Sequence, residues 1–343
     1  MKALLFSQPG LQNLTFGDYQ TPDIHEDEVL VETKCMGVNP IDYYTVTGLH
    51  GTDGPKMKIF PYPHIPGTEI SGEVKRIGFK TKSNISEGDR VIIYNRLFDG
   101  TCVYCRSGLQ NMCVDGGMIG IQTNGGFSEY VKVPYQNIIK IPDDMDWELA
   151  SALPIAGLTA YNAIIQSGLK PKENLLIFGG SGNTGLFSAQ IGKFLGAITI
   201  SVSSKEWLSD YGVDHFFKND QYLVENISRV TNTKMIDVVI NSLGEKTWKQ
   251  GMATVGKMGR VITFGVLTGG KLEIDGRLLY NNQITIKGTT GGTLQELIDL
   301  IELTRKESFR TRIWKKFSLE DSNQAIEMVF DKKREGRIII TNY

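Results

Sequence analysis

Apolar residues in the second half of the chain alternate between short continuous runs and helical stripes. The run at 175–178 leads into a glycine-rich turn, after which apolar residues recur at Phe187, Ile191, Phe194 and Leu195. A short apolar run bounded by glycine predicts a buried strand, and the i, i+4, i+7, i+8 spacing predicts an amphipathic helix. This stretch therefore predicts a strand, a tight turn and a helix.

The same alternation extends over most of the chain from about residue 147. Further strands are predicted at 198–202, 238–241, 261–264 and 284–287, and helices at 148–153, 157–166, 205–211 and 247–255. Strands that alternate with helices predict a parallel sheet covered by helices. A helix at 294–305, a helical segment at 322–330 and a last strand at 336–341 complete the pattern.

The first 150 residues have a different pattern, with short β-like runs between turns and little helical periodicity. The runs lie at 1–6, 28–34, 69–77, 90–94 and 129–133. We expect an α/β protein in which residues 1–150 form an irregular antiparallel β domain and 151–290 a nucleotide-binding domain. We expect residues 291–343 to return to the first domain.

The glycine turn contains the most informative motif. Gly180-Ser181-Gly182-Asn183-Thr184-Gly185 reads G-x-G-x-x-G between a predicted strand and a predicted helix, the context that gives the motif meaning. The first glycine allows the turn, the second lets a pyrophosphate approach the backbone, and the third lets helix and strand pack closely. The motif predicts dinucleotide binding. A glycine turn without a ligand is the alternative.

The end of the second strand of this unit indicates which dinucleotide binds. An acidic residue there normally binds the ribose 2′-hydroxyl of NAD, whereas this chain has Ser203, Ser204 and Lys205. Two hydroxyls and a lysine suit a 2′-phosphate and favour NADP(H). Alternatively, Lys205 is a solvated residue neutralised by Glu206. The later strand that ends at Phe264-Gly265 should reach the nicotinamide.

Three cysteines are clustered in the first half of the chain. Cys102, Cys105 and Cys113 have the spacing C-x2-C-x7-C, and Asp99 precedes the first of them by three residues. Four ligands make a closed tetrahedral zinc site, in which a carboxylate oxygen is acceptable. The pattern predicts one structural zinc ion per chain, with Asp99 as the fourth ligand. A loop that has lost its metal is the alternative.

Composition and charge narrow the classes of partner. The 343 residues include 37 Lys plus Arg and 38 Asp plus Glu, a net charge of -1 that gives no electrostatic reason to expect nucleic acid or anionic membrane as partner. No apolar run reaches the ~18 residues that span a bilayer. Clustered cysteines suit metal binding in a reducing compartment, so we expect a cytoplasmic protein. We also expect its partner to be a small-molecule substrate.

Several motifs together resemble the medium-chain dehydrogenase/reductase superfamily of zinc alcohol dehydrogenases and quinone reductases. They are residues 37–42 (GVNPID), 66–69 (PGTE), 88–91 (GDRV), 152–161 (ALPIAGLTAY), the cysteine cluster and the glycine turn. The resemblance implies a GroES-like β-barrel catalytic domain, a Rossmann domain with a doubly wound parallel sheet, and Thr159 near the cofactor. It also implies a homodimer or homotetramer, and it places Asp99 where the family usually has a first cysteine.

The chain departs from that family at the catalytic metal. Zinc alcohol dehydrogenases hold this zinc with Cys, His and Cys, and the matching positions here are Asn39, Thr68 and Ala156. Outside the cluster only Cys35 remains, and the four histidines lack metal-ligand spacing. A zinc held by His64 and Glu69 is the alternative.

Without a Lewis acid, a conjugated acceptor is the easier substrate, because hydride can add to its β-carbon and leave an enolate. We therefore expect an NADPH-dependent oxidoreductase acting on a quinone, enal, enone or enoyl thioester. The resemblance points to Tyr44 as donor or relay, Asn39 as the residue that orients the substrate oxygen, and His50 as a weaker candidate. A zinc-dependent alcohol dehydrogenase and a non-enzymatic NADPH-binding protein are the alternatives.

Overall fold

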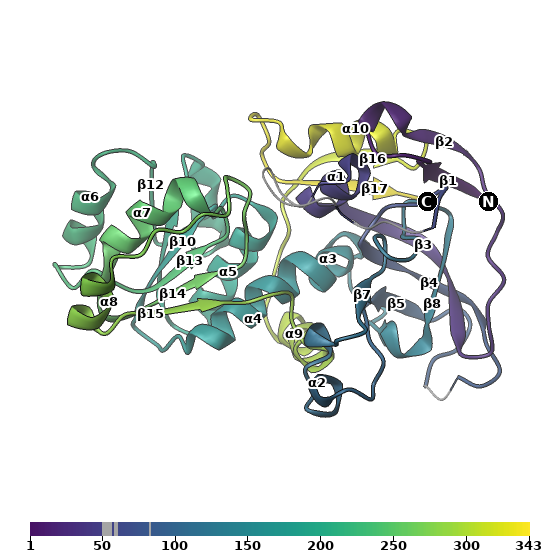
Figure 1. The fold of residues 1–343 in the computed structure, drawn as a ribbon, viewed down its shortest axis with the longest axis horizontal. Helices are drawn as coiled ribbons and strands as arrows, with labels where there is room; N and C mark the ends of the chain where they lie inside the picture. Colours follow the sequence, from purple (N-terminus) through teal and green to yellow (C-terminus); the bar gives the residue numbers. More distant parts are fainter. Residues whose placement is uncertain (50–56, 58–60, 82–83) are drawn as a thin grey trace. The chain divides into compact units, whose positions relative to one another are not determined.

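The computed structural model describes residues 1–49, 57, 61–81 and 84–343 (Figure 1). The chain divides into two compact units. The first combines the described residues of 1–155 with Thr293–Tyr343, and the second is built from Ala156–Gly292. Each unit has its own hydrophobic core, and the first contains two such clusters.

A seven-stranded sheet forms the frame of the first unit, in the order β16-β17-β3-β4-β5-β9, with β8 paired to β3. All its pairings are antiparallel except that of β16 with β17. Two-stranded sheets β1-β2 and β6-β7 complete the unit. The strands are β1 (Lys2–Leu5), β2 (Thr15–Asp18), β3 (Glu28–Val38), β4 (Glu69–Ile77), β5 (Arg90–Ile93), β6 (Arg96–Leu97), β7 (Gly117–Met118), β8 (Tyr130–Pro134), β9 (Ile138–Lys140), β16 (Ile313–Ser318) and β17 (Arg337–Thr341).

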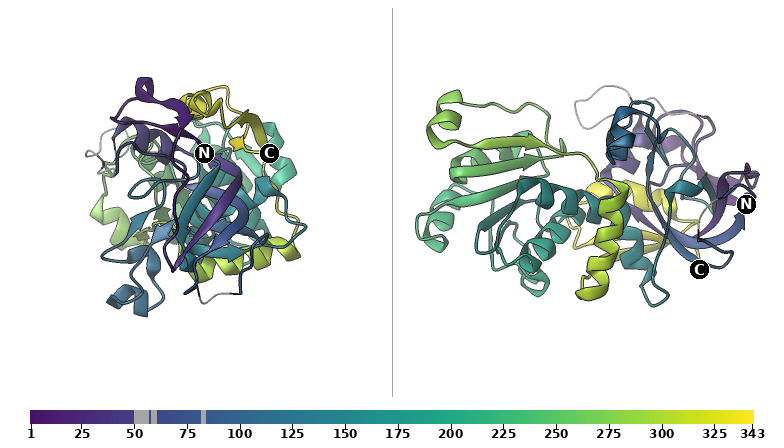
Figure 2. Two further views of the ribbon diagram at one scale, coloured as in Figure 1. Left: turned by 90° about the vertical axis from the view of Figure 1, so that its right-hand side faces the viewer. Right: turned by 90° about the horizontal axis from the view of Figure 1, so that it is seen from below.

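The C-terminal strand β17 pairs antiparallel with β3, so both ends of the chain belong to this unit (Figure 1 and Figure 2). The α-helices of the unit are α1 (Pro40–Thr47), α2 (Val103–Arg106), α3 (Trp147–Ala152), α9 (Leu294–Lys306) and α10 (Ser322–Glu327). Single 3-10 turns lie at Leu11–Asn13, Gln110–Met112, Tyr135–Asn137 and Met328–Phe330.

Helix α1 is absent from the sequence-based prediction. It begins after Asn39 with Pro40 in its first turn and ends at Gly48, whose φ of 76° is left-handed. Its buried residues are Asp42, Tyr44, Thr45 and Val46, so polar side chains occupy its inner face. No apolar stripe marks such a helix, and periodicity alone does not detect it.

The second unit contains a six-stranded, wholly parallel sheet in the order β12-β11-β10-β13-β14-β15. Numbered within the unit this is 3-2-1-4-5-6, the doubly wound order of dinucleotide-binding folds. The expected α/β fold class is confirmed. The elements are α4 (Leu158–Ser167), β10 (Asn174–Phe178), α5 (Asn183–Phe194), β11 (Ile198–Val202), β12 (His215–Phe217), α6 (Leu223–Val230), β13 (Ile236–Asn241), α7 (Glu245–Thr254), β14 (Val255–Thr263), α8 (Gly276–Asn282) and β15 (Thr285–Gly288).

Three elements of this unit, β12, α6 and α8, are missing from the sequence-based prediction. The helix expected at 205–211 is instead the 3-10 helix Glu206–Tyr211. Strand β12 has only three residues, and α8 has no buried residue, so neither produces a periodic apolar pattern.

Helices α3 and α4 are joined by the π-helical turn Leu153–Gly157 into one helical run, Trp147–Ser167. This 21-residue run is long and apolar enough to cross a membrane, by length and composition only. It corrects the expectation that no such run exists. Since 67% of its apolar window is buried inside the structure, the run has the burial of a core helix.

Candidate functional site

The glycine turn connects the buried strand β10 to helix α5 in the second unit. Gly179 has the left-handed φ of 79°, and its carbonyl accepts a hydrogen bond from the Gly182 N–H at 2.9 Å. The residue that makes the turn is therefore Gly179, because only a glycine adopts this φ without cost. This corrects the assignment of the turn to Gly180.

Gly180 and Gly185 are needed for close packing. A Cβ on Gly185 would lie 2.2 Å from the Gly179 carbonyl oxygen, so any side chain would push α5 away from the end of β10. A Cβ on Gly180 would lie 1.9 Å from the Ser201 Oγ on β11. The helix therefore starts directly at the turn, with Ser181, Asn183 and Thr184 in the arrangement that receives phosphates in dinucleotide-binding proteins.

The carboxyl ends of β10, β13 and β14 converge on Ser242. Its hydroxyl donates to the Phe178 carbonyl at 3.0 Å, and a Cβ on Gly265 would lie 2.0 Å from the Ser242 carbonyl oxygen. Ligands of such sheets bind beyond these strand ends. Phe264 and Gly265 follow β14 at this edge, and Ser242 is a further residue of the edge that sequence reasoning missed.

Ser203, Ser204 and Lys205 follow β11 at the same edge of the sheet. The Ser203 N–H donates to the Phe217 carbonyl at 2.8 Å, and the Lys205 N–H donates to the Ser203 Oγ at 3.2 Å. Ser203 and Lys205 are half-buried and Ser204 is exposed. Thr159 lies in the first turn of α4 and is partly exposed.

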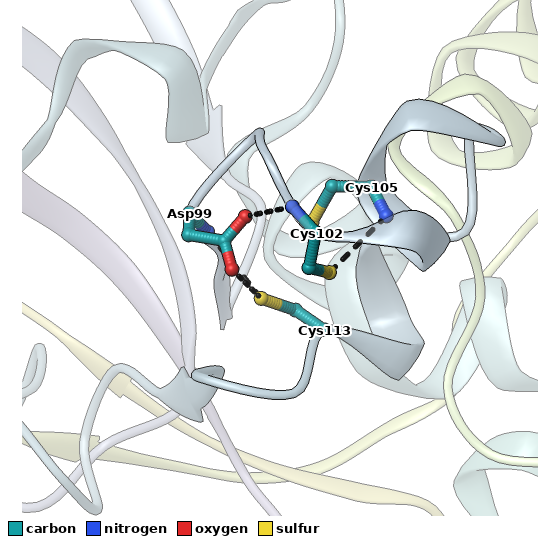
Figure 3. Close-up of side chains that lie close together, drawn as sticks. All are labelled: Asp99, Cys102, Cys105 and Cys113. Atoms are coloured by element: carbon teal, nitrogen blue, oxygen red, sulfur yellow. Dashed lines mark hydrogen bonds between the residues drawn. The ribbon is translucent and has the colours of Figure 1, made fainter.

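The first unit brings together the four predicted metal ligands (Figure 3). One ligand atom from each of Asp99, Cys102, Cys105 and Cys113 lies within 4.8 Å of the others. Short α2 carries Cys105, and Cys102 caps it, with its Sγ accepting from the Cys105 N–H at 3.5 Å. Three thiols and one carboxylate are a ligand set that zinc accepts, so the cluster fits a closed zinc site.

Hydrogen bonds orient the carboxylate of Asp99. Its Oδ1 accepts from the backbone N–H groups of Thr101 at 2.5 Å and Cys102 at 2.8 Å, which directs Oδ2 toward the Cys113 Sγ, 3.3 Å away. The same backbone N–H groups hold the pKa of the Asp99 carboxyl below its usual range. The carboxylate is therefore ionised and one of its oxygens faces the sulfur atoms.

A second polar group joins Asn39, which caps α1, to Thr68, which precedes β4; the resemblance places metal-ligand positions at both residues. The buried Asp42 carboxylate accepts from the Asn39 N–H at 2.8 Å and from the Thr68 N–H at 3.1 Å and hydroxyl at 2.9 Å. Burial raises the pKa of Asp42 to about 7. Sequence reasoning missed Asp42, although Asn-x-x-Asp resembles a helix capping pattern.

Tyr44 lies on the buried side of α1 and is 8% exposed. Its ring centroid is 6.0 Å from that of Tyr43 and 5.8 Å from that of Phe330, which is half exposed. Tyr44 and Asn39 thus belong to the same helix and its cap. His50, the third residue proposed from the resemblance, lies outside the described residues.

Glu69 and His64 already have structural partners. Glu69 forms a buried ion pair with Arg337 of β17, and His64 Nε2 lies 3.0 Å from the Gly120 carbonyl oxygen. Burial lowers the pKa of His64, which favours its neutral form. Among the residues that the structure describes, Asp99 and the three cysteines form the only group of three or more His, Cys, Asp or Glu side chains close enough together to share a metal ion. These contacts weigh against a zinc held by His64 and Glu69.

The fourth cysteine, Cys35, lies apart from the metal cluster. It is buried in β3, where its Sγ is 3.5 Å from the Ser151 Oγ. Burial raises the pKa of this thiol to about 11. Cys35 is therefore a core residue.

Comparison with known proteins identifies the family. Residues 25–143 match the family described as alcohol dehydrogenase GroES-like domain, and residues 184–306 match zinc-binding dehydrogenase. A NAD-dependent alcohol dehydrogenase of Sulfolobus acidocaldarius is 28% identical, with 99% of each chain covered. An acryloyl-coenzyme A reductase of Metallosphaera sedula is 26% identical, with 94% of this chain and 95% of that protein covered.

Similar solved structures belong to the same family as these relatives. A thermostable alcohol dehydrogenase from Pyrobaculum aerophilum is 33% identical and superposes with a TM-score of 0.90 over 100% of this chain and 99% of that one. A cobalt- and zinc-bound structure of a thermostable alcohol dehydrogenase from the same organism is 32% identical, also with a TM-score of 0.90. The chain therefore belongs to the zinc-type alcohol dehydrogenases of the medium-chain dehydrogenase/reductase superfamily and is an oxidoreductase with a GroES-like and a Rossmann domain.

Proposed function

We propose that this protein is an NADPH-dependent reductase of conjugated acceptors that works without a catalytic zinc. The observation that carries the proposal is the arrangement around Asp42. Asn39 and Thr68 stand at two of the positions where the resemblance places metal ligands. Asp42 accepts from the Thr68 hydroxyl and from the backbone N–H of Asn39, so the residues at these positions are an amide and a hydroxyl beside a buried carboxylate. Neither replaces a thiolate or an imidazole as a strong zinc ligand.

The proposed chemistry relies on hydrogen-bond donors. When bound, the reduced nicotinamide supplies a hydride to the β-carbon of the acceptor. The protein then has to stabilise negative charge on the acceptor oxygen, and preorganised donors in a dry site do this best. We assign Tyr44 as the donor or proton relay and Asn39 as the residue that orients the oxygen. His50 is a weaker candidate for the same work.

The substrate class is an enal, enone, quinone or enoyl thioester. The acryloyl-coenzyme A reductase of Metallosphaera sedula is named for a conjugated thioester, which supports this class. Relatives named NAD-dependent alcohol dehydrogenase support the second candidate function, a zinc-dependent alcohol dehydrogenase. A non-enzymatic NADPH-binding protein is the third.

The proposed preference for NADPH rests on Ser203, Ser204 and Lys205, where no carboxylate repels a 2′-phosphate. Relatives named NAD-dependent give no support to this choice. Competing titrations with NADPH and NADH decide between the cofactors, and tighter binding of NADH would overturn the proposal.

For the metal, we propose one structural zinc ion per chain, held by Cys102, Cys105, Cys113 and the Oδ2 of Asp99. Four protein ligands close the coordination shell, so the ion would brace the loop and leave no position for substrate. The orientation of the Asp99 carboxylate toward Cys113 supports its role as fourth ligand.

The test of function is NADPH oxidation with a panel of quinones, enals and enoyl-CoA thioesters, beside alcohol oxidation with and without chelator. The proposal expects turnover of a conjugated acceptor that chelator leaves unchanged, and a Tyr44→Phe variant with lower kcat but unchanged affinity for NADPH. Alcohol oxidation that chelator abolishes would instead establish the alcohol dehydrogenase. Tight NADPH binding without turnover would support a non-enzymatic protein.

We also propose a cytoplasmic homodimer or homotetramer that binds neither nucleic acid nor membrane. Strand β15 lies at one edge of the parallel sheet, and an uncovered strand edge is a natural place for a second copy to pair. The proposal of a reducing compartment rests on the three clustered cysteines, which suit metal binding better than a disulfide framework. Light scattering would measure the assembly, and a monomer would refute it.

A further inference from the structure

Strands β11 and β12 end side by side in the second unit. They are parallel, with Val202 opposite Phe217. The ladder continues one step past the strands, because the Ser203 N–H donates to the Phe217 carbonyl at 2.8 Å. In a parallel ladder this bond places Ser203 opposite the residue after Phe217, which is Lys218. Ser203 and Lys218 therefore share one face at the carboxyl edge of the sheet.

Lys218 brings a positive charge to this edge. Its side chain is exposed, and it forms no ion pair with any residue in the described part of the chain. Of the two nearest acids in sequence, Asp214 pairs with Lys193 at 2.5 Å, and Asp220 accepts from the Tyr222 N–H at 2.9 Å, which directs that oxygen to the backbone without removing its charge.

A phosphate monoester carries a charge of about −1.5 to −2 at pH 7 and three acceptor oxygens, so more than one cation is needed to balance it. Neighbouring strands lie ~4.8 Å apart, and a lysine side chain spans more than that distance. An anion bound by the Ser203 hydroxyl is therefore within reach of the Lys218 ammonium. Lysine binds phosphate as a point charge and needs no fixed geometry to do so.

We propose that Lys218 is a specificity-determining residue that binds the 2′-phosphate of NADPH together with Ser203 and Lys205. This inference rests on the proposed preference for NADPH and adds to it a residue from a different strand. A residue that contacts only the 2′-phosphate contributes nothing to NADH, so its effect is confined to one cofactor.

The test compares wild type with Lys218→Gln, Lys218→Arg and Lys257→Gln by isothermal titration calorimetry. The ligands are NADPH, NADH, 2′,5′-ADP and 5′-ADP, which vary the 2′-phosphate with and without the nicotinamide half. Lys257 is the matched control, since it is an exposed lysine near the start of β14, at the amino edge of the same sheet.

We expect Lys218→Gln to bind NADPH and 2′,5′-ADP about tenfold more weakly, a change of about 1.4 kcal/mol. Affinities for NADH and 5′-ADP should stay unchanged, as should all affinities of Lys257→Gln. Lys218→Arg should retain the wild-type preference. Because Lys218 is exposed, the melting temperature should not move.

Two results would overturn the inference in distinguishable ways. If wild type binds NADH as tightly as NADPH, the proposed cofactor preference fails, and the role of Lys218 fails with it. If wild type prefers NADPH but Lys218→Gln keeps that preference, or weakens both cofactors equally, only the role of Lys218 is refuted.

Discussion

The buried ion pair between Glu69 and Arg337 allows a quantitative test of how the first unit is held together. The side chains are 0% and 2% exposed, and they belong to β4 and β17, with the two residues 268 positions apart in sequence. Nε and Nη1 of Arg337 have no hydrogen-bond partner among the described residues. Replacing Glu69 by Gln removes the negative charge and leaves a buried guanidinium without its counter-charge.

Breaking a buried ion pair by removing one partner costs about 3–5 kcal/mol. For a unit of this size, each kcal/mol shifts the melting temperature by ~2–4 °C, so Glu69→Gln should lower it by ~6–20 °C. Glu302→Gln is the matched control, because its pair with Arg305 is about half exposed and worth less than ~1 kcal/mol. Differential scanning fluorimetry measures both variants.

A double variant, Glu69→Leu with Arg337→Met, separates the loss of a partner from the value of the pair itself. Apolar replacement of a buried ion pair is often neutral or stabilising. The double variant should therefore melt above Glu69→Gln. A Glu69→Gln variant that melts within the range of Glu302→Gln would refute the reasoning, because it would mean that the guanidinium finds adequate compensation without Glu69.

Three other predictions test particular residues. Burial raises the pKa of Asp42 to about 7, above its ordinary 3.8, so the stability that this group contributes is complete below about pH 4 and is lost as pH rises toward 7. The difference in free energy of unfolding between wild type and Asp42→Asn should therefore shrink between about pH 4 and 7, as measured by urea unfolding at several pH values. A difference that does not change with pH would contradict this prediction. Cys105→Ser should lose bound zinc by mass spectrometry and melt lower while NADPH affinity is kept, whereas Cys35→Ser should keep its metal. A Cβ at Gly185 would lie 2.2 Å from a backbone oxygen, whereas at Gly276 nothing lies within 4 Å. Gly185→Ala should therefore lose ~1–3 kcal/mol of stability and at least tenfold in NADPH affinity, and equal behaviour of Gly276→Ala would argue against a packing role.

Local features of the site follow from spacing along the chain. Cys102 and Cys105 are three residues apart, and a short helical turn brings both sulfurs to one side, so their arrangement is encoded within a few residues. Asp99 joins them because backbone N–H groups two and three residues ahead fix its carboxylate. The strand, turn and helix around Gly185 are equally local.

Contacts between distant segments cannot be predicted in this way, because residues that are far apart in the sequence form no local spacing pattern. The partner of Glu69 is 268 residues away, and Lys218 meets Ser203 only because β12 pairs with β11. Gly37 belongs to the same class, since a Cβ there would lie 2.1 Å from the Arg337 guanidinium and from the Glu69 carboxylate. Position 37 therefore has to be glycine because of two side chains that are distant in the sequence.

The sequence by itself determined the α/β class, the dinucleotide motif and the metal-binding spacing, because backbone geometry turns local periodicity into strands, helices and loops. Only the tertiary structure showed that α1 is a helix and that Gly179 makes the turn. It also showed that Asp42 accepts hydrogen bonds from Asn39 and Thr68, and that Glu69 forms an ion pair with Arg337. These features depend on which buried polar groups the packing brings together, and burial gives each of them its energetic weight.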